Sequence, residues 1–382
     1  MSALSTTPVT PAGPTEPAGP AAGPVAGSAD STRPSAQAGT RPREHRYDID
    51  LLRVLASVGV IVCHSAAELM NAVHRTPGEG RAVYWTALVA DGLSRCAVPL
   101  FFAMAGWVVL SGAPPRDSRQ IRTRLTRIVV PFAVWTVLYL LWERVRGVNA
   151  DPTRKVAFEA LFGSVQPAFH LWYLYSYVPV ILLLSVVVLI RAGKRPWGPA
   201  AVLLALTLVP ALLGDARTVF GLDLPRSAWN FGAYQVAYAI AGALLLSLPA
   251  TASTGRRRRL LWLGAAGCAW AATVAHEHYV HFPAAYASLF VALLAGTLLM
   301  AFNRLTVPAR LRPHLTRLGG AAFGAYLVHV VFLKALSPHL VSAGAGPLRA
   351  PAALAALTVV TVVLSFAASL AWDRARLGRV LG

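Results

Sequence analysis

Long apolar segments joined by arginine-rich connections restrict the fold of this chain more than any other feature. Apolar windows fall near residues 48–68, 83–111, 127–143, 168–190, 199–214, 228–248, 260–275, 283–302, 319–340 and 350–372. A helix of about 20 apolar residues crosses a bilayer, and in lipid only helices or closed barrels satisfy every backbone polar group. We therefore predict an all-α, polytopic membrane protein with about ten transmembrane helices.

The second of these windows is too long for one straight membrane helix. Pro99 lies near its middle, and a proline inside a helix removes one backbone hydrogen bond and favours a kink. We therefore expect the segment either to kink at Pro99 or to lie partly along the membrane interface.

The composition agrees with a membrane protein and argues against a soluble one. Hydrophobic residues make up 56% of the 382 residues and charged residues only 13%, about half the charged share of a typical soluble domain. The net charge of +19 would suit a nucleic-acid-binding protein, but the positive residues cluster in the short connections. Because such clustering is typical of membrane topology, we expect a lipid bilayer and no nucleic acid as partner.

The positions of the positive residues also predict an orientation. If the N-terminus is cytoplasmic, most of the 35 lysines and arginines fall on the cytoplasmic side, as the positive-inside rule requires. The loop over residues 144–167 is an exception, because it places four positive residues outside. We expect both termini to be cytoplasmic, in a multi-pass cell-membrane protein.

The sequence divides into three segments. Residues 1–45 are rich in Pro, Ala, Gly, Ser and Thr and cannot bury a core, so we expect a disordered cytoplasmic tail. Residues 46–375 form the membrane domain, and residues 376–382 form a short basic cytoplasmic tail. The first apolar run comes too late and is too long for a cleavable signal peptide, which makes it a retained first span.

Ionisable residues within the first apolar segment point to a function. In the stretch YDIDLLRVLASVGVIVCHSAAEL, Arg53 and His64 are 11 residues apart. At about 100° per residue they share one helix face, roughly 16 Å apart along the axis. Asp50, Ser57 and Glu68 fall on the same stripe. Ionisable groups inside a membrane usually face a cavity and mark a functional path.

The chemistry of these side chains predicts their roles. Imidazole titrates near neutral pH, so His64 is the candidate general base, and Glu68, one turn away, would orient it or balance its charge. Arg53, at the inner end, would take part in catalysis and bind an anionic group. The alternatives are an arginine that snorkels to the interface and a structural, hydrogen-bonded histidine.

Three further positions carry charge inside or beside the membrane. Asp91 and Arg95 are four residues apart and share a helix face, so they predict a buried ion pair that is either structural or part of a substrate site. Glu143 lies at the outer end of the third segment, where it is either a substrate contact or an ordinary interfacial charge. We include all three among the candidate substrate-binding residues.

The stretch IRTRLTRIVVPF opens the third apolar segment at the cytoplasmic side. Its arginines, Arg122, Arg124 and Arg127, are explained by positive-inside topology. They also suit a phosphate clamp, since guanidinium groups bind phosphate oxygens in a bidentate manner. We predict that these three residues and Arg53 bind the phosphate groups of a ligand.

Aromatic and imidazole groups form the last set of candidates. His170 and Trp172 lie where the fourth segment enters from outside, and Tyr326 and His329 lie near the middle of the ninth. An aromatic belt accounts for the tryptophan but not for the histidines. We expect these four residues to contact the substrate.

The stretch HEHYVH contains His276, Glu277, His278 and His281 and at first suggests a metal site. It departs from the zinc motif HExxH, because Val280 stands where the second histidine belongs. We therefore expect a polar cluster in an outer loop and no bound metal. The sequence also has no phosphate-binding loop, dinucleotide fingerprint or nucleophile elbow.

Five of these stretches, in order, resemble the acyltransferase-three family of integral-membrane O-acyltransferases. They are YDIDLLRVLASVGVIVCH, with its Arg-x10-His pair, SRCAVPLFFAMAGW, the Arg-x-Arg pair in IRTRLTR, HLWYLYSYVP and GAYLVH. The chain is most similar to the branch that acetylates bacterial surface polysaccharides such as enterobacterial common antigen. One departure is Ala105, which stands where the family more often has serine, so we assign no hydroxyl role there.

The resemblance implies an enzyme of the bacterial inner (plasma) membrane that moves an acyl group, expected to be acetyl, from acyl-CoA to a hydroxyl. The acceptor would be a glycan, a lipid-linked sugar or a small molecule such as a macrolide. The principal alternative is a proton-coupled secondary transporter or exporter, which would also use an intramembrane polar stripe. Transporters often show repeated halves, and the Arg-x10-His stretch does not recur in the second half. A membrane scaffold with structural ion pairs is a third possibility.

Overall fold

The computed structural model describes residues 45–147, 151–163, 165, 168–222, 224, 226–249, 251 and 255–382. The tail that we predict to be disordered, residues 1–45, lies outside the described residues except for His45. The described part of the chain is helical, with α1 (Tyr47–Ala72), η1 (Pro77–Glu79), α2 (Arg81–Ser94), α3 (Ala97–Trp107), η2 (Val108–Gly112), α4 (Ser118–Arg146), α5 (Thr153–Phe162), η3 (Phe169–Leu171), α6 (Trp172–Arg191), α7 (Trp197–Phe220), α8 (Ala233–Ser247), α10 (Arg256–Tyr279), α11 (Leu289–Phe302), η4 (Ala309–Leu311), α12 (Arg312–Leu340), α13 (Arg349–Arg374) and α14 (Gly378–Leu381).

All ten apolar windows form helices, but they differ in how well suited they are to cross a membrane. Within the described residues, seven helical segments are long and apolar enough to span a bilayer, and α8 and α11 are shorter apolar helices. The remaining window forms α10, which four arginines at its start make less apolar. The chain is therefore a multi-pass membrane protein, and its orientation stays a prediction.

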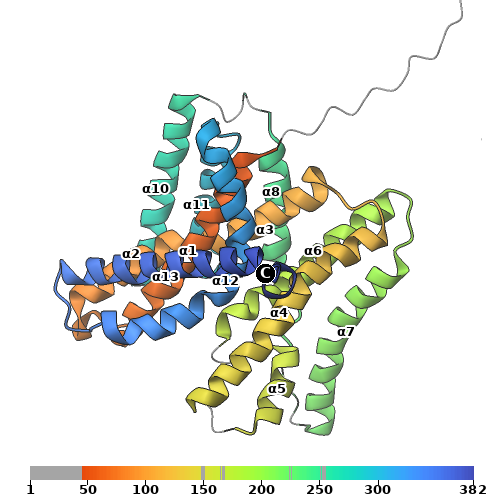
Figure 1. Ribbon diagram of the computed structural model, residues 1–382, viewed down its shortest axis with the longest axis horizontal. Coiled ribbons are helices and arrows are strands. Elements are labelled where there is room, and N and C mark those ends of the chain that lie inside the picture. The colour runs from red at the N-terminus through yellow and green to blue at the C-terminus, as the bar shows by residue number, and fades with distance from the viewer. Residues whose placement is uncertain are drawn as a thin grey trace, which may run out of the picture. The chain divides into compact units, whose positions relative to one another are not determined.

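The membrane unit, Arg46–Gly382, is organised around α1. This helix packs against α12, α2 and α3, while α12 pairs with α13, α3 with α8 and α10 with α11 (Figure 1). By contrast α7 contacts α6 and α4, and none of its side chains is buried. Because its residues are almost all apolar, α7 presents its outer face to lipid. The candidate functional site is built from residues of α1, α3, α6 and α12.

The long second window is broken, but not within the helix at Pro99. Its first part, α2, ends at Ser94 and α3 begins at Ala97, so the break falls at Arg95 and Cys96. Pro99 lies in the first turn of α3 and has no N–H to donate to the carbonyl of Arg95, which interrupts the hydrogen-bond ladder there. A π-helical segment, η2, then ends the window.

The start of α4 is fixed by its own side chains. Asp117 accepts a hydrogen bond from the backbone N–H of Gln120 at 2.7 Å, and the Gln120 side chain accepts from the N–H of Arg116 at 3.0 Å. This reciprocal cap begins the helix at Ser118, about two and a half turns before residue 127, where the apolar window begins. At the other end, Gly147 adopts a left-handed conformation with φ 64°, which glycine tolerates.

Two short helices lie in segments where we predict none. α5 occupies the middle of the loop over residues 144–167 and packs on α4. The segment predicted as a short basic tail, residues 376–382, contains α14, which also packs on α4. There the indole of Trp135 donates to the carbonyl of Leu381 at 3.0 Å.

Glycines allow α3 and α8 to approach each other closely. A Cβ atom built on Gly106 would overlap the backbone of Ala239, and one on Gly242 would overlap that of Ala103. Small residues at helix crossings permit this packing in membranes. We therefore expect Gly106→Ala to force the helices apart and destabilise the protein by about 1–3 kcal/mol, the usual cost of overpacking.

Thermal unfolding in detergent measures this effect, and Gly264→Ala is the matched control. Gly264 lies in α10 with no neighbouring atom within 4 Å of an added Cβ, so alanine there should stabilise the helix by roughly 0.5–1 kcal/mol. Equal melting temperatures for Gly106→Ala and the wild type would contradict the close-packing interpretation.

Candidate active site

The polar stripe on α1 begins with an ion pair. Nη1 of Arg53 lies 3.2 Å from Oδ1 of Asp50, one turn earlier. The other carboxylate oxygen, Oδ2, accepts a hydrogen bond from Thr316 at 3.3 Å. Further along, Ser57 donates to the carbonyl of Ala322 in α12 at 3.4 Å. The stripe therefore faces α12, and Arg53 is oriented by Asp50.

Three histidines from different helices meet around the other end of the stripe. The ring of His64 stacks on that of His329, with centroids 5.2 Å apart, and lies 6.4 Å from that of His170. The rings of His170 and His329 are 5.1 Å apart and nearly perpendicular. The structure thus brings together residues of α1, η3 and α12 that are far apart in sequence.

Backbone carbonyls fix the proton positions on two of these rings. Nδ1 of His329 lies 2.5 Å from the carbonyl of Tyr326, and Nε2 of His170 lies 3.4 Å from the carbonyl of Leu327. A carbonyl can only accept, so these nitrogens carry the protons when the rings are neutral. Nε2 of His329 and Nδ1 of His170 are buried and have no hydrogen-bond partner within the described structure. Both therefore offer free lone pairs inside the bundle.

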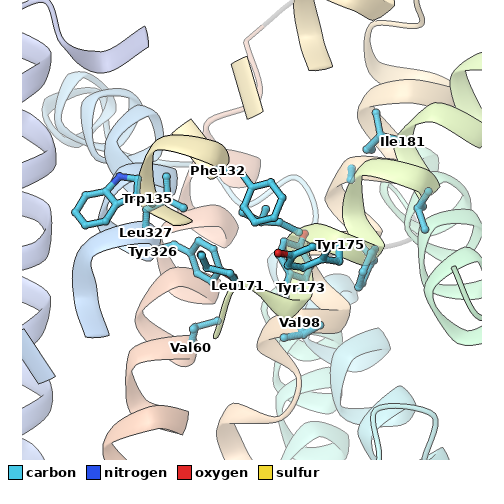
Figure 2. Packing of buried hydrophobic residues seen from close by; sticks show 14 of the residues in the cluster. Val60, Val98, Phe132, Trp135, Leu171, Tyr173, Tyr175, Ile181, Tyr326 and Leu327 are labelled. Atoms are coloured by element: carbon cyan, nitrogen blue, oxygen red, sulfur yellow. The ribbon is translucent and has the colours of Figure 1, made fainter. Parts of the chain in front are cut away.

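A small cavity of about 30 Å³ lies beside the histidines. It is lined by Val60, Cys63, His64, Ser94, Ala97, Val98, Phe101, His170, Trp172, Tyr173, Tyr286 and Tyr326. Figure 2 shows four of these residues within the surrounding aromatic and aliphatic core: Val60, Val98, Tyr173 and Tyr326. The volume is about that of one water molecule in the liquid. We call this space the histidine cavity; by this measure it has room for on the order of one or two water molecules.

The aromatic candidates belong to this cavity. The hydroxyl of Tyr326 donates to the carbonyl of His170 at 2.6 Å, which ties α12 to η3. Trp172 stacks on Tyr286, with ring centroids 5.5 Å apart. Glu143 is buried in α4 and is not among the residues that line this cavity.

Glu68 has a partner that the sequence pattern did not reveal. Its carboxylate accepts a hydrogen bond from the ammonium of Lys334 in α12 at 2.6 Å. The same ammonium lies 6.0 Å from the ring centroid of Phe169, which in turn contacts the ring of His64. Lys334 thus pairs with Glu68 because α12 packs directly on this face of α1, and the predicted role of Glu68 beside His64 stays a prediction.

The predicted pair of Asp91 and Arg95 is present and is part of a larger buried cluster. The guanidinium donates to both carboxylate oxygens, at 2.6 and 2.9 Å. Glu277 of α10 lies 3.4 Å from the same guanidinium. Thus Glu277, which belongs to the HEHYVH stretch, completes an ion cluster. Cys63 connects it to the histidine cavity by donating from Sγ to Asp91 at 3.5 Å.

A second cavity, of about 310 Å³, lies beside Arg53, Arg124 and Arg127. We call it the arginine cavity. Its other lining residues are apolar or aromatic and come from α3, η2, α4 and α6: Phe101, Met104, Ala105, Val108, Val109, Ile128, Tyr177 and Ile181. Nη1 of Arg124 is buried and has no hydrogen-bond partner among the described residues, while Nη2 bonds to the carbonyl of Ala113. Such a free guanidinium donor suits an anionic ligand.

The structure places Arg122 apart from the other arginines. It lines a different, largely apolar groove with Arg119, between α4 and α7. The reason is helical geometry, since residues two apart point to nearly opposite sides while residues three apart are neighbours. Arg124 and Arg127, not Arg122 and Arg124, therefore share a face.

Ionisable side chains gathered inside a multi-pass helical bundle are typical of a membrane enzyme or transporter that handles a polar substrate. The comparison with protein families decides between the two. A family described as an acyltransferase domain matches residues 46–370, which is most of the chain. The chain belongs to this acyltransferase-three family and is an acyltransferase. No curated protein and no solved structure matches the sequence.

Proposed function

We propose that this protein moves an acetyl group from acetyl-CoA to a hydroxyl of a cell-surface glycan, with His64 as the general base. The observation that supports this most is the pair of cavities on one helix. Arg53 lines the arginine cavity and His64 lines the histidine cavity, three turns further along α1. One helix thus presents an anion-binding group and a base to the same interior.

The arginine cavity suits the donor. Coenzyme A carries phosphate groups, and Arg53, Arg124 and Arg127 offer several charged donors for them. The apolar walls contributed by α3 and α6 suit the uncharged pantetheine arm. Arg122 lies in another groove, so in this proposal it does not touch the donor.

The histidine cavity suits the transfer step. His64 accepts the proton of the acceptor hydroxyl while that oxygen attacks the thioester carbonyl and forms the new ester bond. The carbon–sulfur bond then breaks, and the proton leaves with the sulfur as the free thiol of coenzyme A. Tyr326, Trp172, His170 and His329 surround the acceptor, and the cluster of Asp91 and Arg95 supports the wall beside them.

The proposed orientation follows from the positive-inside rule. With both termini in the cytoplasm, the arginine cavity opens toward the cytoplasmic donor and the histidines lie in the outer half of the membrane. An acceptor outside the cell then meets the acyl group without crossing the bilayer. A surface glycan fits this geometry better than a cytoplasmic metabolite.

Purified protein in lipid nanodiscs, incubated with radiolabelled acetyl-CoA, tests the proposal. Three acceptors are supplied in parallel: extracted surface glycan, lipid-linked sugar and a macrolide. We expect label in the glycan, released as acetate by mild alkali because the bond is an ester. Label in either other acceptor would reassign the substrate, and label in none would contradict acetyl transfer.

A further inference from the structure

The two cavities follow the same three helices. Along α3, Ala105 and Met104 line the arginine cavity, with Val108 of the adjoining η2, and Val98 and Ala97 line the histidine cavity. Along α6, Ile181 and Tyr177 line the first cavity, and Tyr173 and Trp172 line the second. Together with Arg53 and His64 on α1, these residues describe one interrupted passage between the helices.

Phe101 lies where the passage is interrupted. It lines both cavities, next to Met104 on one side and Val98 on the other along the same helix. Its ring is 6.0 Å from that of Tyr173, which contacts the ring of Tyr177 at 5.1 Å. The phenyl group is half-buried and has no polar atom to bond. The phenyl ring therefore separates the two cavities by its bulk and not by a polar contact.

We propose that Phe101 determines which acyl groups the enzyme transfers, by limiting the size of the group that passes from the arginine cavity to the histidine cavity. This inference rests on the proposed function. The donor's acyl end must pass Phe101 to reach His64, and the space beyond it is only about 30 Å³. A short acyl group enters with a small rotation of the ring, whereas a longer one requires space that the ring occupies.

Acyl-chain selectivity of Phe101→Ala is the direct test. Purified wild type and variant receive acetyl-CoA or hexanoyl-CoA with the same acceptor, and the ratio of hexanoyl to acetyl transfer is measured. Because a pocket discriminates by at least about tenfold per methylene that it excludes, we expect the ratio to rise by about tenfold or more in the variant. Phe101→Leu, which preserves more of the packing, should shift the ratio in the same direction.

Phe102→Leu is the matched control, since Phe102 is the neighbouring phenylalanine and packs into the aromatic core against Tyr173. Its ratio should equal that of the wild type. If the wild type transfers acetyl and Phe101→Ala keeps the wild-type ratio, the proposal for Phe101 fails and the proposed function stands. If the wild type transfers from neither donor, both fail.

Discussion

Replacing His64 with alanine is expected to abolish acyl transfer while the protein still inserts and folds. The ring stacks on His329 and lines the histidine cavity, so its loss removes the proposed base. General-base catalysis typically contributes roughly 10²–10⁴-fold in rate. We therefore expect kcat to fall by about that factor, with little change in the dissociation constant for acetyl-CoA. Both are measured on purified protein.

His339→Ala provides the control, because His339 is an exposed histidine on the same helix as His329. It should behave as the wild type. A second variant, His329→Ala, distinguishes the base from its neighbour, since Nε2 of His329 is also free to accept a proton. Near-normal transfer by His64→Ala together with complete loss in His329→Ala would assign the general base to His329 of α12 instead of His64 of α1.

The double variant Arg124→Gln, Arg127→Gln is expected to weaken donor binding more than any other change outside the histidine cluster. Both side chains line the arginine cavity with Arg53. A hydrogen bond to a charged group contributes about 1.5–3 kcal/mol, so each lost contact should raise the dissociation constant roughly 10- to 100-fold. Calorimetry with coenzyme A and its dephosphorylated form measures the effect, which should be smaller for the latter.

Two arginines on the same helix serve as comparisons. Arg119→Gln removes the same charge from the groove between α4 and α7 and should leave donor affinity unchanged. Arg122→Gln tests which assignment of Arg122 is correct. The Arg-x-Arg motif predicts that Arg122 binds the donor, whereas the structure places it in the groove between α4 and α7. Donor affinity lost in Arg122→Gln but kept in the double variant would overturn the assignment of the arginine cavity.

Much of the helical architecture could be predicted from the sequence, because apolar windows of bilayer length allow few alternatives. The polar stripe of α1 was equally predictable, since the period of a single helix places Arg53 and His64 on one face. The break beside Pro99 was predicted in kind but not in position. The amphipathic segment α5 was missed because it lies among charged residues outside the apolar windows.

Contacts between helices were harder to predict from the sequence. The partner of Glu68 is Lys334, more than 260 residues away, and no local pattern links the two positions. The contact between Glu277 and Arg95 was missed for the same reason, although the sequence singles out Glu277 within a stretch that resembles a zinc motif. For the arginines of α4, helical spacing would have separated Arg122 from the other two, because residues three apart share a face and those two apart do not; the predicted clamp did not apply this rule.

The small size of the histidine cavity has a consequence for the fate of the activated acyl group. A thioester beside a base reacts with whichever hydroxyl arrives first, and water is by far the most abundant. In the proposed mechanism, a cavity of about 30 Å³ has room for only on the order of one or two water molecules, so few waters compete with the acceptor for the acyl group. The close packing of aromatic rings would thereby limit the loss of the proposed acyl donor to hydrolysis.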